Sequence, residues 1–106
     1  MRKVSRKWGH YRTLFRTKRF ALKILVFDRP LGKQRHFHRN EKWFFVGGRG
    51  VFVTEDFQTS RRELVVSPAI RTVPPRTWHD FIPHQPSTVI EFQWGNKVTE
   101  EDIERA

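Results

Sequence analysis

The sequence contains no cysteine, and this absence excludes both disulfide bonds and thiolate metal sites. Any metal must therefore be held by histidine, carboxylate or amide ligands. Long apolar runs are missing as well, because none approaches the ~20 residues that a membrane-spanning helix needs. The basic amino-terminal segment lacks the apolar stretch of a secretory signal. We therefore expect a cytoplasmic protein with no membrane partner.

Acidic residues are scarce: 11 Asp and Glu face 21 Lys and Arg, which gives a formal net charge of +10. A field of that sign favours anionic partners, which include phosphorylated small molecules, nucleic acids and acidic proteins. The basic residues are scattered along the chain and do not form a single tail. Charge alone therefore does not choose among these partners.

The hydrophobic pattern is that of β-strands. A chain of 106 residues is long enough for one core, and we expect a single domain over 1–106 with its core at about 8–105. Short segments rich in β-branched and aromatic residues predict strands at 21–27, 42–46, 50–54, 63–67, 70–73, 78–82 and 88–94. Turn residues separate them, and "VGGRG" and "DFQTSRR" predict two hairpins. This spacing indicates a sandwich, a jelly roll or a small barrel.

Only the last eight residues, "TEEDIERA", have a helical pattern. Thr99 can act as the amino-terminal cap, Asp102 follows three residues later, and acidic residues occupy the first turn. These signals predict a short carboxy-terminal helix that begins near Thr99.

The segment "QRHFHRNEKW" has the composition of a metal site. Side chains alternate faces along a strand, so Gln34, His36 and His38 are predicted to point the same way. A return strand would bring Glu41 over that face, and His79 is a candidate ligand from a remote strand. Zinc, manganese or iron accepts such a set of nitrogen and oxygen ligands. The alternative interpretation is that these histidines belong to a solvated basic surface.

Two segments resemble the sequence motifs of the cupins. The first motif, His-x-His-x(3,4)-Glu-x(6)-Gly, is matched by Gln34, His36, Glu41 and Gly48, with glutamine at the first histidine position. The second, Pro-x-Gly-x-x-His, is matched by residues 74–79, with Arg76 in place of glycine and His79 at the end.

The likeness is more specific to type II mannose-6-phosphate isomerases. "QRHFHRNEKWFFVGGRG" resembles their signature, "KWGHY" their entry segment and "IEFQWGNKVTEEDIER" their ending. Phe37, Asn40 and Lys42 depart from the signature. The resemblance implies a cupin double-stranded β-helix, an all-β jelly-roll barrel with a metal inside, and by analogy a homodimer. The family often accompanies a guanylyltransferase domain, but no Gly-rich nucleotide loop precedes these motifs, so guanylyl transfer is not expected.

The resemblance also implies an activity, the interconversion of mannose 6-phosphate and fructose 6-phosphate in sugar-nucleotide or polysaccharide metabolism. The implied ligands of a divalent metal are Gln34, His36, Glu41 and His79, with zinc first and manganese, iron or nickel as alternatives. His38 is the candidate base, although it could replace Gln34 as a ligand, and Arg39 is a candidate for binding phosphate or sugar oxygens. Arg76, Glu91 and Gln93 are candidate substrate contacts. Two other functions stay open: a non-catalytic metal- and sugar-binding cupin, and a basic nucleic-acid-binding protein.

Overall fold

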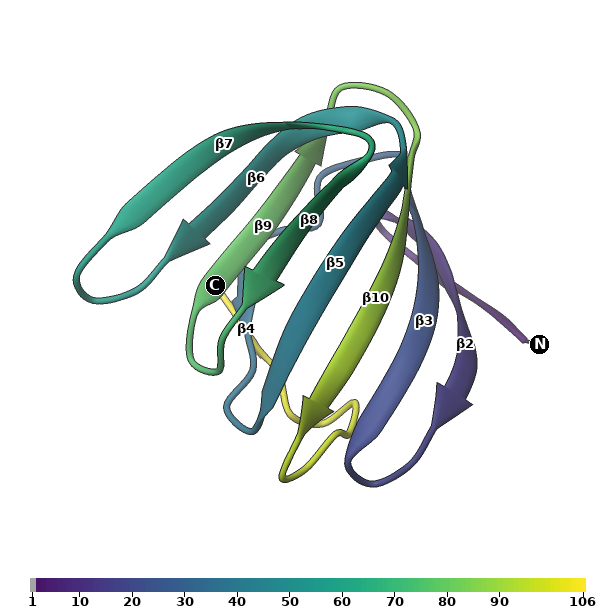
Figure 1. Cartoon of the computed structure of the whole chain (residues 1–106), viewed down its shortest axis with the longest axis vertical. Helices are drawn as coiled ribbons and strands as arrows, with labels where there is room; N and C mark the ends of the chain where they lie inside the picture. The colour runs from purple at the N-terminus through teal and green to yellow at the C-terminus, as the bar shows by residue number, and fades with distance from the viewer. Residues whose placement is uncertain (1) are drawn as a thin grey trace.

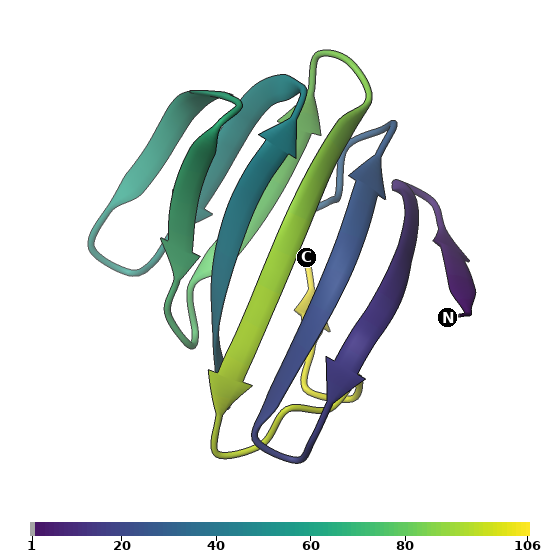
Figure 2. The ribbon, with the colours of Figure 1, turned by 45° about the vertical axis from the view of Figure 1, so that its right-hand side comes forward.

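The computed structural model describes residues 2–106, which form two antiparallel β-sheets that face each other (Figures 1 and 2). The strands in these residues are β1 (Lys3–Arg6), β2 (Gly9–Arg16), β3 (Phe20–Phe27), β4 (Gln34–Arg35), β5 (Arg39–Gly47), β6 (Arg49–Glu55), β7 (Ser60–Val66), β8 (Ala69–Val73), β9 (Trp78–Pro83), β10 (Ser87–Gly95) and β11 (Glu104–Arg105). One sheet has six strands in the order β1-β2-β3-β10-β5-β8, and the other has five in the order β11-β4-β9-β6-β7. The predicted all-β jelly-roll architecture is confirmed.

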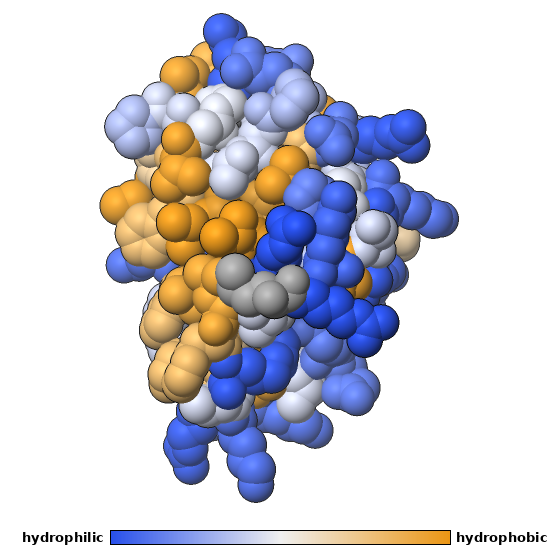
Figure 3. Space-filling view, turned by 90° about the vertical axis from the view of Figure 1, so that its right-hand side faces the viewer, coloured by the Kyte–Doolittle hydropathy of each residue, from blue (hydrophilic) through white to orange (hydrophobic). Residues whose placement is uncertain are grey.

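Alternation along the strands builds the core. On β3, β5 and β10 every second residue is buried between the sheets, as the period-two pattern of the sequence predicts. Aromatic rings fill the interior: Phe27 packs edge-on against Phe81 at 5.2 Å, and Trp43 against Phe52 at 5.3 Å. Figure 3 shows that apolar side chains also gather on one outer side of the molecule, while the other side in that view is mostly hydrophilic.

One of the two predicted hairpins is wrong. "DFQTSRR" does join the antiparallel neighbours β6 and β7, with Glu55 opposite Ser60. "VGGRG", however, carries the chain from β5 in one sheet to β6 in the other. Gly48 adopts a φ of 89° there, and a Cβ at this position would collide with the Ser87 side chain. The glycines therefore serve a tight crossing between sheets.

The predicted carboxy-terminal helix is also wrong. Residues 99–106 form a turn, in which the Asp102 N–H donates to the Thr99 carbonyl at 3.3 Å, followed by β11, which pairs with β4. A helix this short is marginal in water, so contacts with the barrel decide the conformation. The Asp102 carboxylate binds the backbone of another segment, and Glu100 binds Lys23. Since residues 2–106 contain no helix, none of them provides one long and apolar enough to cross a membrane.

Candidate metal centre

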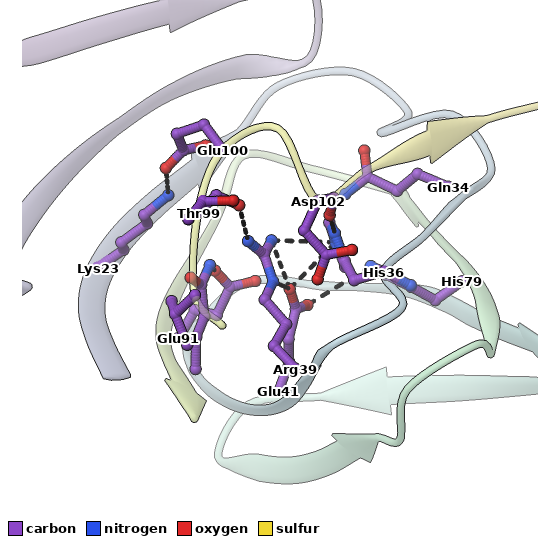
Figure 4. A network of polar contacts seen from close by, with 12 residues as sticks. Lys23, Gln34, His36, Arg39, Glu41, His79, Glu91, Thr99, Glu100 and Asp102 are labelled. Atoms are coloured by element: carbon purple, nitrogen blue, oxygen red, sulfur yellow. Dashed lines mark hydrogen bonds and ion pairs between the residues drawn. The ribbon is translucent and has the colours of Figure 1, made fainter. Parts of the chain in front are cut away.

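Three side chains that can bind a metal meet between the two sheets. His36 follows β4, Glu41 lies on β5, and His79 lies on β9, so the cluster joins both sheets. One ligand atom from each lies within 4.8 Å of the others, and all three residues are buried. Figure 4 shows the three side chains converging from these separate elements.

Each imidazole presents its Nε2 atom to Glu41. His36 Nε2 lies 3.1 Å from Glu41 Oε2, and His79 Nε2 lies 3.5 Å from Glu41 Oε1. On the far side of each ring, Nδ1 faces a backbone carbonyl, that of Asp102 for His36 and that of Thr77 for His79. Each Nδ1 therefore carries the hydrogen, and each Nε2 keeps its lone pair. Such a carbonyl contact is the usual means by which a protein orients a histidine ligand.

Burial sets the charges of the cluster. It lowers the pKa of His79 to about 4 and lowers that of His36 as well, outweighing the opposing effect of Glu41. Burial would raise the pKa of Glu41, but His36, Arg39 and His79 together hold it below its usual range. At neutral pH the cluster therefore contains two neutral imidazoles and one carboxylate, the protonation state that binds a metal ion.

The residues present fit a cation. His79 Nε2 is buried and finds no hydrogen-bond partner among residues 2–106. It faces a carboxylate oxygen, which is also an acceptor, and two buried acceptors side by side are unfavourable unless a proton or a cation lies between them. A divalent metal would satisfy both groups at once.

Arg39 lies beside this cluster on β5 and is buried. Its guanidinium donates to Glu41 Oε2, to His36 Nε2 at 3.0 Å and to the Thr99 carbonyl at 3.2 Å. The sequence suggested Arg39 as a phosphate or sugar contact. In the structure its hydrogen bonds go to the candidate ligands and to the carboxy-terminal segment.

Glu91 and Gln93 point inward from β10 and line the cavity beside the cluster. Gln93 Nε2 donates to Glu91 Oε1, and Gln93 lies opposite Glu41 in the pairing of β10 with β5. Burial, with a further contribution from Glu41, raises the pKa of Glu91 to about 8. A carboxyl group and an amide thus face the space next to the candidate metal ligands.

The other two candidate ligands in the "QRHFHRNEKW" segment, Gln34 and His38, lie in different places. Gln34 is buried, pairs with His79 in the sheet, and accepts a hydrogen bond from Arg105 Nη1 at 3.1 Å. The expectation that His38 shares its face is wrong, because β4 ends at Arg35 and the chain bends over 37–38. His38 is consequently exposed, outside the cavity.

Arg76 acts through its backbone. It is exposed, and it adopts a φ of 64°, in the left-handed region that residues other than glycine rarely adopt. In this conformation its N–H donates to the His36 carbonyl at 2.6 Å. The turn that is usually formed at glycine is therefore kept despite the arginine side chain, and it supports a candidate ligand.

Sequence reasoning missed the contribution of the carboxy-terminal segment. The Asp102 carboxylate accepts from the backbone N–H groups of Phe37 at 2.8 Å and His38 at 2.9 Å, while its carbonyl faces His36 Nδ1. Lys23 is buried in the apolar pattern of β3, where it binds Glu100 at 2.5 Å and lies 4.5 Å from the centre of the Tyr11 ring. The signal that could have identified Lys23 is its place in the sequence, because a lysine at an inward position of an apolar strand needs a buried partner.

A family model described as "Mannose-6-phosphate isomerase C-terminal" matches residues 1–106. No match is found among curated proteins.

Solved structures of similar fold include several larger proteins. Capsular polysaccharide assembling protein CapF from Staphylococcus aureus has a TM-score of 0.77 and 16% identity, over 97% of this chain and 31% of CapF. Oxalate decarboxylase from Bacillus subtilis has a TM-score of 0.86 and 12% identity, over 98% of this chain and 29% of that one. A cupin superfamily protein from Desulfitobacterium hafniense has a TM-score of 0.69 and 13% identity, over 79% of this chain and 74% of that one. The chain thus spans about a third of CapF and of oxalate decarboxylase, and the predicted cupin fold is confirmed.

Proposed function

The chain belongs to the mannose-6-phosphate isomerase C-terminal family, and we propose that it is a metal-dependent isomerase that interconverts mannose 6-phosphate and fructose 6-phosphate. The observation that carries this proposal is the buried cluster of His36, Glu41 and His79, in which His79 Nε2 has no partner among the described residues. His36 also lines a cavity together with Glu91 and Gln93. The likeness to CapF, a capsular polysaccharide assembling protein, supports a setting in polysaccharide metabolism.

The metal would be held by His36, Glu41 and His79, with the Gln34 amide beside them. When bound, a divalent metal supplies a Lewis acid for the carbonyl oxygen of the open-chain sugar. Two imidazoles and a carboxylate suit zinc, and manganese, iron and nickel are the alternatives. Asp102 and Thr77 keep the rings oriented through their carbonyl groups.

The isomerisation also requires that a proton move between C1 and C2 of the sugar. His38, the candidate from the sequence, is exposed, whereas the Glu91 carboxyl faces the cavity. We assign the proton transfer to the Glu91 carboxyl oxygens on the basis of this position. Gln93, bound to Glu91, holds that carboxyl and offers its Oε1, which has no partner among the described residues, to a sugar hydroxyl.

Metal-loaded protein should convert mannose 6-phosphate to fructose 6-phosphate, and in D2O it should exchange the C2 proton of the sugar for deuterium. Replacing Glu91 by glutamine should lower kcat about 100-fold, because the proton carrier is lost, while the bound metal measured by elemental analysis stays the same. NMR spectroscopy follows both reactions.

Glu63→Gln is the control, since Glu63 lies on the outer strand β7 beside Arg71, and it should leave kcat unchanged. Metal-loaded wild-type protein that neither converts the sugar nor exchanges its C2 proton would contradict the isomerase proposal. Binding of the sugar without turnover would then assign the chain to the non-catalytic metal- and sugar-binding cupins.

A further inference from the structure

A second cavity lies beside the candidate metal centre and is basic. Its volume is about 390 Å³, and the basic side chains that line it are Arg6, Lys7, Lys33 and Arg105. Trp8 and Leu31, both buried, provide apolar surface. Arg6, Trp8, Leu31 and Arg105 also line the inner cavity that contains His36 and Glu91, so the two cavities adjoin.

The charges of this basic cavity are largely uncompensated. Arg6, Lys7 and Arg105 form no ion pair within residues 2–106, and Lys33 is the member that has one, with Glu55 at 3.2 Å. No acidic side chain is among the lining residues. Cations nearer the metal centre differ, since Lys23 pairs with Glu100 and Arg39 with Glu41. Adjacent unpaired cations around a concave surface attract an anion.

The inner cavity is too small for a whole phosphosugar. Its volume is about 60 Å³, which admits only a small part of such a molecule. Arg105 stands at the junction of the two cavities, where it donates to Gln34 Oε1, and Gln34 pairs with His79 in the sheet. A ligand that extends from one cavity into the other would place its anionic end at Arg105 and its other end near the His36 imidazole.

We propose that the basic cavity formed by Arg6, Lys7, Lys33 and Arg105 binds the phosphate group of the sugar, while C1 and C2 enter the inner cavity. This inference rests on the proposed function. This assignment differs from the one that the sequence suggested, in which Arg39 and Arg76 contact the substrate. Arg39 is already bound to Glu41, and Arg76 is exposed at a turn outside both cavities.

The test is binding of inorganic phosphate by the metal-loaded protein, measured by titration calorimetry at constant ionic strength. The double variant Arg6→Gln, Arg105→Gln should weaken phosphate binding at least roughly tenfold, because charge-assisted hydrogen bonds are lost. Its KM for mannose 6-phosphate should rise by a similar factor with kcat nearly unchanged. Arg62→Gln, an exposed arginine of β7, is the matched control and should change neither value.

Phosphate binding that is equally tight in the double variant, or equally weakened by Arg62→Gln, would overturn the proposal. Its failure is distinguishable from that of the proposed function, because phosphate binding is measured without turnover. Selective loss of phosphate binding in a protein that never isomerises the sugar supports the anion site and contradicts the isomerase.

Discussion

Replacing His79 by alanine should lower the affinity for zinc and manganese roughly a thousandfold. A protein-bound zinc ion contributes about 10–16 kcal/mol in all, so one of the three protein ligands accounts for about 3–5 kcal/mol. His79 comes from β9, whereas Glu41 comes from β5, so only the folded barrel brings them together. Titration of metal-free protein with each metal measures the change.

The fold should survive this substitution. His79 Nε2 has no hydrogen-bond partner in residues 2–106, and Nδ1 has one long contact of 3.4 Å with the Thr77 carbonyl, so little hydrogen bonding is lost. Thermal unfolding in the presence of a chelator verifies this. His84→Ala, at an exposed histidine after β9, should keep the parent affinity. If His79→Ala binds metal as tightly as the parent, the proposed site is wrong, and the isomerase proposal fails with it.

Replacing Asp102 by alanine should destabilise the protein by about 3 kcal/mol, since its carboxylate accepts two backbone hydrogen bonds and hydrogen bonds to charged groups contribute about 1.5–3 kcal/mol each. Two N–H groups, of Phe37 and His38, would lose their partner. For a domain of this size the melting temperature should fall by more than ~10 °C. Calorimetry or circular dichroism measures the shift.

The Asp102 carbonyl also faces His36 Nδ1, so loosening this turn should reduce metal affinity in the protein that remains folded. Glu101→Ala removes a neighbouring exposed carboxylate and should leave both stability and affinity nearly unchanged. Equal melting temperatures for Asp102→Ala and the parent would show that the carboxy-terminal segment does not hold the ligand loop.

The strands were predictable because a buried sheet face imposes alternation, and the cluster was predictable because His36, Glu41 and His79 match a spaced motif. Two errors have separate physical causes. The helix at Thr99 had good local signals, but polar contacts of Glu100 and Asp102 with the barrel prevailed over them. His38 was misplaced because alternation holds only while a strand continues, and no local signal in the sequence marked the end of β4 at Arg35.

The position of β10 determines when this protein can fold during its synthesis. β10, Ser87–Gly95, lies between β3 and β5, so the central part of the larger sheet is missing until residue 95 has left the ribosome. Before that point the apolar strands β3 and β5 have exposed edges with no native partner between them, a state prone to aggregation. The larger sheet is therefore completed only once β10 has emerged, and the folded cluster of the two histidines and Glu41 can take up a metal ion only then.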